Sequence, residues 1–273
     1  MRFTKLGKVI DKFAPSMGRT YRNMRDRGSF GNPRLTAYGF TLAGSPPLAE
    51  ITFEADETAL FLELLETHDA VFDIGANVGF YSCLAASRSK QTVAFEPFQR
   101  NLNFLYRNLT DNKFTWVEVF PLGLGGSPGL KQIYGFADVA SFVPGWNRAN
   151  NKLFSTVPIT TLDTIAVHRF KCKRLLIKMD VEGFELEVLA GAVDTLNLNP
   201  KPTWLIEILL NNKAIPDGIN QRFREVFELF WKIGYSCQSV EDGRKFVTKV
   251  DVDKWVADGK VEGGKSNFMF FAG

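Results

Sequence analysis

An apolar run leads into a turn with two glycines at residues 71–79, which read Val71-Phe72-Asp73-Ile74-Gly75-Ala76-Asn77-Val78-Gly79. Residues 70–74 are typical of a short buried strand, and residues 78–87 have helical spacing. Glycine permits positive φ and a close approach of the backbone to a ligand, and the first turn of a helix points free N–H groups into the same space. We therefore expect a ligand site at Gly75, Asn77 and Gly79.

Strands and helices alternate on both sides of this turn. We expect further strands near residues 92–95, 114–122, 174–179, 203–209, 235–240 and 267–271, and helices near 55–67, 97–108, 185–196 and 221–233. This alternation predicts an α/β fold with a mostly parallel seven-stranded sheet and helices on both faces. Ligands bind such sheets at the carboxyl ends of the strands.

An acidic residue, Glu96, follows the strand at 92–95. An acid at this position usually binds the hydroxyls of a ribose. The dinucleotide fingerprint G-x-G-x-x-G, started at Gly75, fails at Asn77 and Phe80, which disfavours a nicotinamide oxidoreductase. The turn and Glu96 together instead look like the cofactor site of a Rossmann-like methyltransferase that uses S-adenosylmethionine (SAM), a cofactor without phosphate.

Three ordered blocks resemble the FkbM methyltransferase family. They are residues 71–82, Phe95-Glu96-Pro97 with Asn101 and Asn108, and residues 177–192 with the sequence Lys178-Met179-Asp180-Val181-Glu182-Gly183. The resemblance covers about residues 70–210. It implies a class I methyltransferase fold and transfer of a methyl group from SAM, mostly to hydroxyl oxygens of sugars and natural products.

The resemblance also suggests which residues contact the cofactor. Asp73 would receive N–H groups of the turn or approach the methionine amino group of SAM; the alternative is that it only caps the turn. Phe98 would pack on the adenine or belong to the core. The predicted cofactor residues are Asp73, Gly75, Asn77, Gly79, Glu96, Phe98, Asn101, Leu122 and Gly123.

Asp180 and Glu182 are the predicted catalytic residues. They follow the strand at 174–179, where enzymes that methylate exocyclic amines usually carry N/D-P-P-Y/F, so this sequence favours a hydroxyl acceptor over a base. We expect one of the two carboxylates to accept the hydroxyl proton. The alternatives are a divalent cation held by the pair and a helix-capping role for one of them. Two carboxylates are too few to predict a metal.

Three further residues are expected to bind the acceptor. Glu207 ends the strand at 203–209 on the same edge of the sheet. Trp146 and Arg148 belong to residues 130–160, a segment rich in aromatic and amide side chains that we interpret as an insertion on the substrate side. A surface lobe with its own small cluster is the alternative.

The charge of the 273-residue chain is unevenly placed. Residues 1–27 hold eight Lys and Arg against two Asp, a net charge of +6, within a total of +3. We therefore divide the chain into a basic N-terminal extension, 1–36, and a methyltransferase domain, 37–273. We expect the extension to form a helix docked on the domain or at a homodimer interface. Contact with an anionic membrane surface or nucleic acid is the alternative.

Composition limits the cellular compartment and the alternative functions that we consider. The three cysteines are sparse and far apart, which argues against a disulfide framework and favours the cytoplasm. The basic extension keeps an RNA methyltransferase as an alternative function, beside a NAD(P)-dependent oxidoreductase and a cofactor-binding module without catalysis. The predicted partner is a small-molecule or glycan acceptor.

Overall fold

The computed structural model describes residues 24, 26, 28, 30–135, 140–146, 151, 153–211, 218–241, 243–264 and 266–272. Arg148 and most of the predicted basic extension, including residues 1–23, lie outside the described residues. Asp26, near the end of that extension, forms an ion pair with Arg100 at 2.5 Å.

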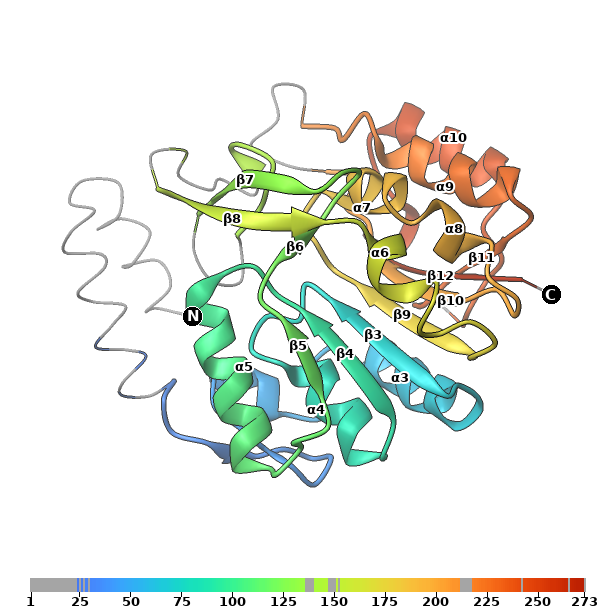
Figure 1. Cartoon of the computed structure of the whole chain (residues 1–273). Coiled ribbons are helices and arrows are strands. Elements are labelled where there is room, and N and C mark those ends of the chain that lie inside the picture. The colour runs from blue at the N-terminus through green and yellow to red at the C-terminus, as the bar shows by residue number, and fades with distance from the viewer. Residues whose placement is uncertain are drawn as a thin grey trace.

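Seven strands form the central sheet, in the order β11-β12-β10-β9-β3-β4-β5 (Figure 1). Four neighbouring pairs are parallel, and β12 runs antiparallel to both β10 and β11. The predicted α/β fold with a mostly parallel seven-stranded sheet is therefore confirmed. The strands are β3 (Ala70–Ile74), β4 (Gln91–Phe95), β5 (Glu118–Phe120), β9 (Leu175–Met179), β10 (Thr203–Glu207), β11 (Ser236–Ser239) and β12 (Asn267–Phe271).

The strand order reverses at β3. This strand pairs in parallel with β4 on one side and with β9 on the other, so the chain continues from β3 in one direction and later returns to its opposite edge. The carboxyl ends of β3, β4 and β9 therefore diverge at a topological switch point, the usual place for a ligand in an open α/β sheet.

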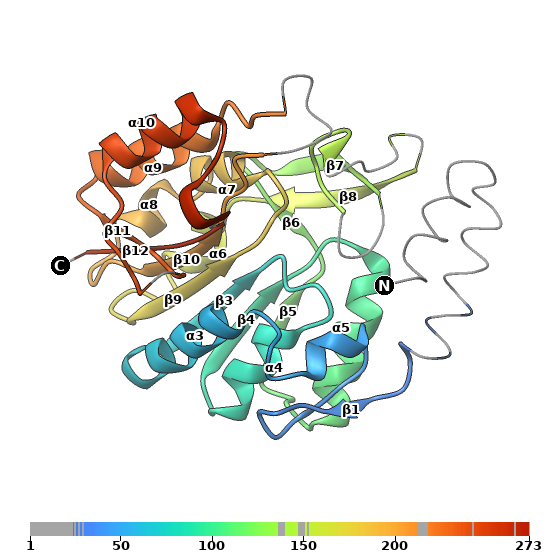
Figure 2. The same ribbon diagram turned by 180° about the vertical axis from the view of Figure 1, so that it is seen from behind.

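Helices cover both faces of the sheet and create two cores. On one face α3 (Ala55–Thr67), α4 (Phe80–Ser87) and α5 (Gln99–Asp111) pack on side chains such as Val71 and Leu176. On the other, α6 (Leu162–Ala166), α7 (Glu185–Ala190), α8 (Val193–Leu196) and α9 (Phe223–Lys232) pack on Phe72 and Ile177. Figure 2 shows α10 (Lys249–Asp258) beside α9. Because side chains alternate along a strand, each buried strand serves both cores.

A smaller sheet extends from the end of β5. It has the order β6-β8-β7, formed by β6 (Gly123–Leu124), β7 (Gly129–Tyr134) and β8 (Phe154–Thr160). The antiparallel pair β7–β8 makes up the two flanks of the predicted 130–160 insertion. Ile133 and Val157 bury its inner face against the core. The substrate-side role of the insertion stays a prediction.

Two predicted elements differ in extent from those in the structure. The strand expected at 114–122 is shortened to β5, because the chain turns at Leu122 into the smaller sheet. The helix expected at 185–196 is interrupted after α7, where Gly191 passes so close to Gly125 that a Cβ would lie 2.1 Å from its carbonyl oxygen. Strand β8 and helix α10 were not predicted from the sequence, although Thr248 and Asp251 form a capping box at the start of α10.

Asn108 of α5 and Asn112, which follows the end of α5, hold the segment that precedes α3. Asn108 accepts a hydrogen bond from the Ala43 N–H at 2.7 Å and donates to the carbonyls of Ala43 and Val78 at 2.9 and 2.8 Å. Asn112 makes equivalent bonds to Thr41 in β2 (Thr41–Leu42). The chain from η1 (Pro46–Ala49) to Glu54 is thereby positioned beside the glycine turn.

None of the helices in the described part of the chain has both the length and the apolar composition needed to cross a bilayer.

Candidate active site

The glycine turn after β3 depends on its glycines. Gly75, Asn77 and Gly79 all have positive φ, at 83°, 51° and 91°. A Cβ on Gly75 would lie 1.8 Å from the carbonyl oxygen of Asp180, and a Cβ on Gly79 would lie 2.4 Å from the Leu105 side chain. Glycine is thus required both for the backbone conformation and for the contact between the ends of β3 and β9.

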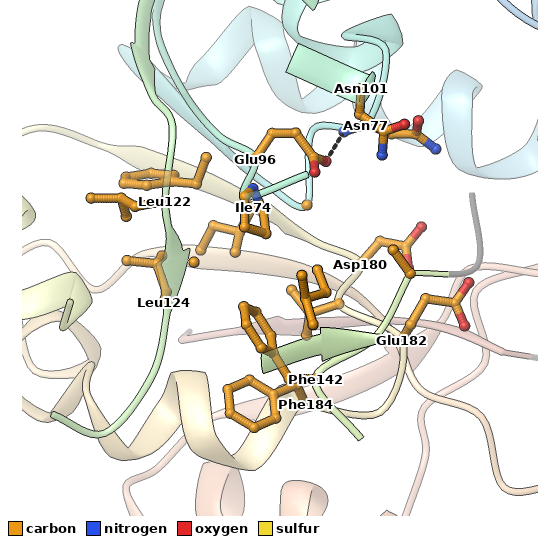
Figure 3. A pocket seen from close by; sticks show the side chains of 17 residues that line it. Ile74, Asn77, Glu96, Asn101, Leu122, Leu124, Phe142, Asp180, Glu182 and Phe184 are labelled. Atoms are coloured by element: carbon orange, nitrogen blue, oxygen red, sulfur yellow. Dashed lines mark hydrogen bonds between the residues drawn. The ribbon is translucent and has the colours of Figure 1, made fainter. Parts of the chain in front are cut away.

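Glu96, at the end of β4, is fixed by the backbone. Its two carboxylate oxygens accept hydrogen bonds from the N–H of Asn77 at 2.8 Å and of Phe98 at 2.7 Å, the first drawn in Figure 3. Burial raises the pKa of Glu96 to about 8, although these bonds and one from Asn101 oppose the shift. Since each oxygen has a second lone pair, the carboxylate can still accept hydroxyl groups of a ligand.

A pocket with about 600 Å³ of empty space, part of it open solvent, lies beside Glu96, and we call it the first cavity. Figure 3 shows Leu122 and Leu124 at one side and Asp180 and Glu182 at the other, with Glu96 between them. Six of the predicted cofactor residues line it: Gly75, Asn77, Glu96, Asn101, Leu122 and Gly123. Both predicted catalytic acids line it as well, so the structure brings the two predicted sets together.

The remaining predicted cofactor residues lie elsewhere. In the structure as described, Gly79 and Phe98 line neither this cavity nor the second one described below. The Phe98 ring packs against the core, the alternative that the sequence left open. Asp73 is buried, and its carboxylate accepts a hydrogen bond from the Ser82 hydroxyl at 2.5 Å. Burial raises the pKa of Asp73 to about 6.

Trp146 supports the loop that carries Glu182. The indole N–H donates to a Glu182 carboxylate oxygen at 2.9 Å, and the Ser141 hydroxyl donates to the Glu182 carbonyl at 2.6 Å. A Cβ on Gly183 would lie 2.5 Å from the Trp146 ring. Trp146 is only 3% exposed, so the structure places it as a support of Glu182, and its expected contact with an acceptor stays a prediction.

A second cavity, of about 450 Å³, lies on the α3–α4 side of the same strand ends. It shares Gly75, Asn77 and Asp180 with the first cavity. Its other walls come from the segment before α3, from β3 and the glycine turn, from α4 and from β9: Leu48, Phe53, Glu54, Asp73, Ala76, Val78, Phe80, Tyr81 and Lys178. Asp180 is therefore the titratable side chain, among the described residues, that lines both cavities.

Lys178 is a buried cation in the wall of the second cavity. Its ammonium lies 3.1 Å from Glu57 of α3, and the two side chains are 4% and 3% exposed. Burial alone would lower the pKa of Lys178, but the carboxylates around it raise the pKa above its ordinary value: Glu57, Asp180, Glu207 and Glu54. Burial raises the pKa of Glu57 to about 7 against the opposing effect of Lys178.

Sequence reasoning did not select Lys178 or Glu57. The available signal was a single lysine inside an otherwise apolar strand, two residues before Asp180 and hence on the same face of the sheet. A buried lysine is rarely tolerated without a partner. The partner itself, on α3, has no fixed spacing from the strand and carries no comparable signal.

Glu207 lies at the end of β10, next to β9 in the sheet. Burial and the neighbouring Asp180 raise its pKa to about 9. It lines neither cavity as the structure describes them, so its predicted contact with the acceptor stays a prediction. The described residues contain no group of three or more His, Cys, Asp or Glu arranged to hold a metal ion.

Several known proteins are similar to this chain. Hexuronic acid methyltransferase AglP of Haloferax volcanii is 28% identical over 149 residues, which are 55% of this chain and 60% of that protein. The chain thus spans less than two thirds of this relative. The crystal structure of methyltransferase FkbM from Methylobacillus flagellatus KT has a TM-score of 0.45 at 19% identity, over 75% of this chain and 44% of that one. An O-methyltransferase from Bacillus cereus in complex with SAH has a TM-score of 0.48 at 12% identity, over 97% and 96%.

A match to a family model shows the family to which the chain belongs. The model of the methyltransferase FkbM domain matches residues 73–237, more than half of the chain. This range begins at Asp73, near the end of β3, and includes Glu96, Asp180 and Glu207, the acids at the ends of β4, β9 and β10. The chain therefore belongs to the FkbM methyltransferase family.

Proposed function

We propose that this protein transfers the methyl group of SAM to a hydroxyl oxygen of a sugar, a glycan or a related natural product. The first cavity carries the proposal. It has a buried carboxylate at Glu96 that can accept further hydrogen bonds, and apolar walls at Leu122 and Leu124. It also has a backbone turn at Gly75 that leaves no room for a side chain. Family membership and the hexuronic acid methyltransferase relative support the same reading.

The residues of the first cavity fit SAM. Glu96 would accept the ribose hydroxyls, and Leu122 and Leu124 would flank the adenine. Asp180 and Glu182, at the other side of the cavity, suit a ligand that carries positive charge. When bound, SAM supplies a methyl group activated by its sulfonium charge.

The residues of the chain would align the acceptor hydroxyl with the methyl group and supply a base. Holding two reactants in line can lower a barrier by about 7–11 kcal/mol. As the acceptor oxygen forms its bond to the methyl carbon, the carbon–sulfur bond breaks, and the hydroxyl proton needs a base. Asp180 is our candidate, because it lines both cavities, whereas one oxygen of Glu182 is occupied by Trp146.

Thermal unfolding with SAM, its demethylated product SAH and NAD tests the cofactor. A ligand at 100 times its Kd should stabilise the protein by about 2.7 kcal/mol. For a chain of this size we expect a rise in Tm of roughly 5–10 °C with SAM and with SAH. A rise with NAD and none with SAM would contradict the proposal and favour the oxidoreductase alternative.

A further inference from the structure

The end of the basic N-terminal extension is attached to α5 through Asp26. Arg100, in the first turn of α5, donates to the two carboxylate oxygens of Asp26 from Nε at 2.5 Å and from Nη2 at 2.7 Å. The two side chains are only 18% and 16% exposed. A bidentate pair that is largely shielded from water fixes the direction of the guanidinium, which an exposed pair does not.

A second contact holds the same stretch of chain on the domain. The N–H of Gly44 donates to the carbonyl of Phe30 at 2.8 Å, and the Phe30 side chain packs against the core on the face of α3, α4 and α5. Asp26 therefore belongs to a segment that is bound to the domain, and its pair with Arg100 is part of that attachment.

Arg100 in turn contacts Asn101, its neighbour on α5. Its Nη1 donates to the amide oxygen of Asn101 at 3.4 Å, and its guanidinium lies 5.0 Å from the centre of the Phe104 ring. A guanidinium has only donors, so it favours the oxygen of a neighbouring amide over the nitrogen. Arg100 thereby selects one of the two orientations of the Asn101 amide.

The selected orientation is the one that suits Glu96. Asn101 is 3% exposed and lines the first cavity, and Figure 3 shows it on the carboxylate side of Glu96. Because the amide oxygen is bound to Arg100, the amide nitrogen is left to donate to Glu96, and this hydrogen bond opposes the rise in the pKa of Glu96. In the reversed orientation an oxygen without a proton would face the carboxylate, which is unfavourable.

We propose that Asp26 and Arg100 are positioning residues for cofactor binding: they orient the Asn101 amide toward Glu96, so the end of the N-terminal extension completes the cofactor site. Neither residue lines the first cavity as the structure describes it, and both would therefore act through Asn101. The inference rests on the proposed function, since Glu96 is the carboxylate that we assign to the ribose hydroxyls of SAM.

Removal of either partner tests this role. Arg100→Met keeps the length of the side chain and removes its donors, and Asp26→Ala removes the carboxylate that holds them. We expect the Kd of SAM, measured by titration calorimetry, to rise about fivefold or more in Arg100→Met and about threefold in Asp26→Ala. Unfolding curves of both variants separate weakened binding from lost folding. An unchanged Kd in both would overturn the proposal.

Arg107→Met is the matched control on the same helix. Arg107 pairs with Asp111 at 3.4 Å, but these side chains are 44% and 38% exposed, and neither residue lines the first cavity as described. Exposed pairs contribute little, so the Kd of SAM should stay within about twofold of the wild-type value. A loss of affinity as large as in Arg100→Met would show that any loss of charge on α5 weakens binding, and would contradict the proposal.

Exchange of the two charges separates orientation of the amide from attachment of the extension. The double variant Asp26→Arg/Arg100→Asp can form an ion pair, but the carboxylate at position 100 has only acceptors and would attract the nitrogen of the Asn101 amide, turning its oxygen toward Glu96. We expect denaturant unfolding to show recovered stability while the Kd of SAM stays raised about fivefold or more. Recovery of SAM affinity together with stability would mean that the pair only attaches the extension, and the proposal would be wrong.

Failure of this inference differs from failure of the proposed function. If the wild-type protein binds neither SAM nor SAH, the proposed function fails. If the wild-type protein binds SAM and both single variants bind it equally well, the role of Asp26 and Arg100 fails alone.

Discussion

The two cavities at the carboxyl edge of the sheet differ in chemistry although three residues line both. The first has apolar walls and a buried acid, Glu96, held by two backbone amides. The second has three aromatic rings, several acids and a buried cation. Ile74 lines the first and its neighbour Asp73 the second. The alternation of side chains along β3 thus lets one strand serve two different sites.

Asp180 is the titratable residue, among those that the structure describes, that lines both cavities, so its loss should produce the largest effect. We expect Asp180→Ala to lower kcat by about 10²–10⁴-fold, the usual contribution of a positioned base. The Kd of SAM should stay within a few fold. SAH formation and titration calorimetry measure the two quantities. Asp56→Ala, at an exposed position of α3, is the control and should keep wild-type turnover. Unchanged turnover in Asp180→Ala would remove this residue from the mechanism.

Lys178 tests whether the second cavity depends on its buried ion pair. Lys178→Met leaves Glu57 buried without its cation, and breaking such a pair costs about 3–5 kcal/mol. We expect denaturant unfolding to show this loss. The double variant Lys178→Met/Glu57→Leu removes both charges and should recover most of the stability. A double variant no more stable than the single one would show that the pair is not the cause.

Gly75 lies between the cavities, so a side chain there should damage both. A non-glycine residue at φ 83° costs about 1–3 kcal/mol, and the new Cβ would also contact the Asp180 carbonyl. We expect Gly75→Ala to lower the free energy of unfolding by at least this amount and to abolish the thermal shift with SAM. The control is Gly129→Ala, where a Cβ meets no atom within 4 Å. Equal stability of the two variants would contradict the role of the close contact.

Glu96 gives the first cavity a pH dependence of its own. Its pKa of about 8 in the folded protein exceeds the ordinary value of 4.5, so the free protein should lose stability as pH rises from 4.5 to about 8, because the unfolded chain ionises first. Ribose hydroxyls donate to the ionised carboxylate and favour it. SAM affinity should therefore rise with pH up to about 8, by at most about tenfold per pH unit.

Calorimetry in buffers of different ionisation enthalpy measures the proton released on binding. Glu96→Gln cannot ionise and should release no proton from this site. If this variant and the wild-type protein release the same amount, Glu96 is not the group that couples binding to pH.

The first cavity could be predicted from the sequence because its residues obey local rules. Gly75 and Gly79 mark a turn, and Glu96 and Asp180 follow strands, so the topology alone places them at one edge. The second cavity could not be predicted in this way. Phe53 and Tyr81 reach it from the segment before α3 and from α4, and Glu57 of α3 pairs with Lys178 in its wall. These contacts depend on how the helices pack on the sheet.

The expected role of Trp146 shows the same limit. An aromatic residue in an insertion can contact a ligand or support a neighbouring loop, and its sequence does not distinguish the two. Only the packing of the ring under Gly183 and the bond to Glu182 distinguish the two roles. The burial of this side chain depends on contacts between segments more than 30 residues apart.

The hydrogen bonds of Asn108 and Asn112 have a consequence for engineering. They attach residues 41–43 to α5, so the outer wall of the second cavity, at Leu48 and Phe53, is carried by a segment anchored to a helix and not to the central sheet. Residues 30–54 could then be exchanged between relatives as a unit, provided that both asparagines are retained. Such chimeras would alter the second cavity while the strand ends that line the first cavity stay as they are.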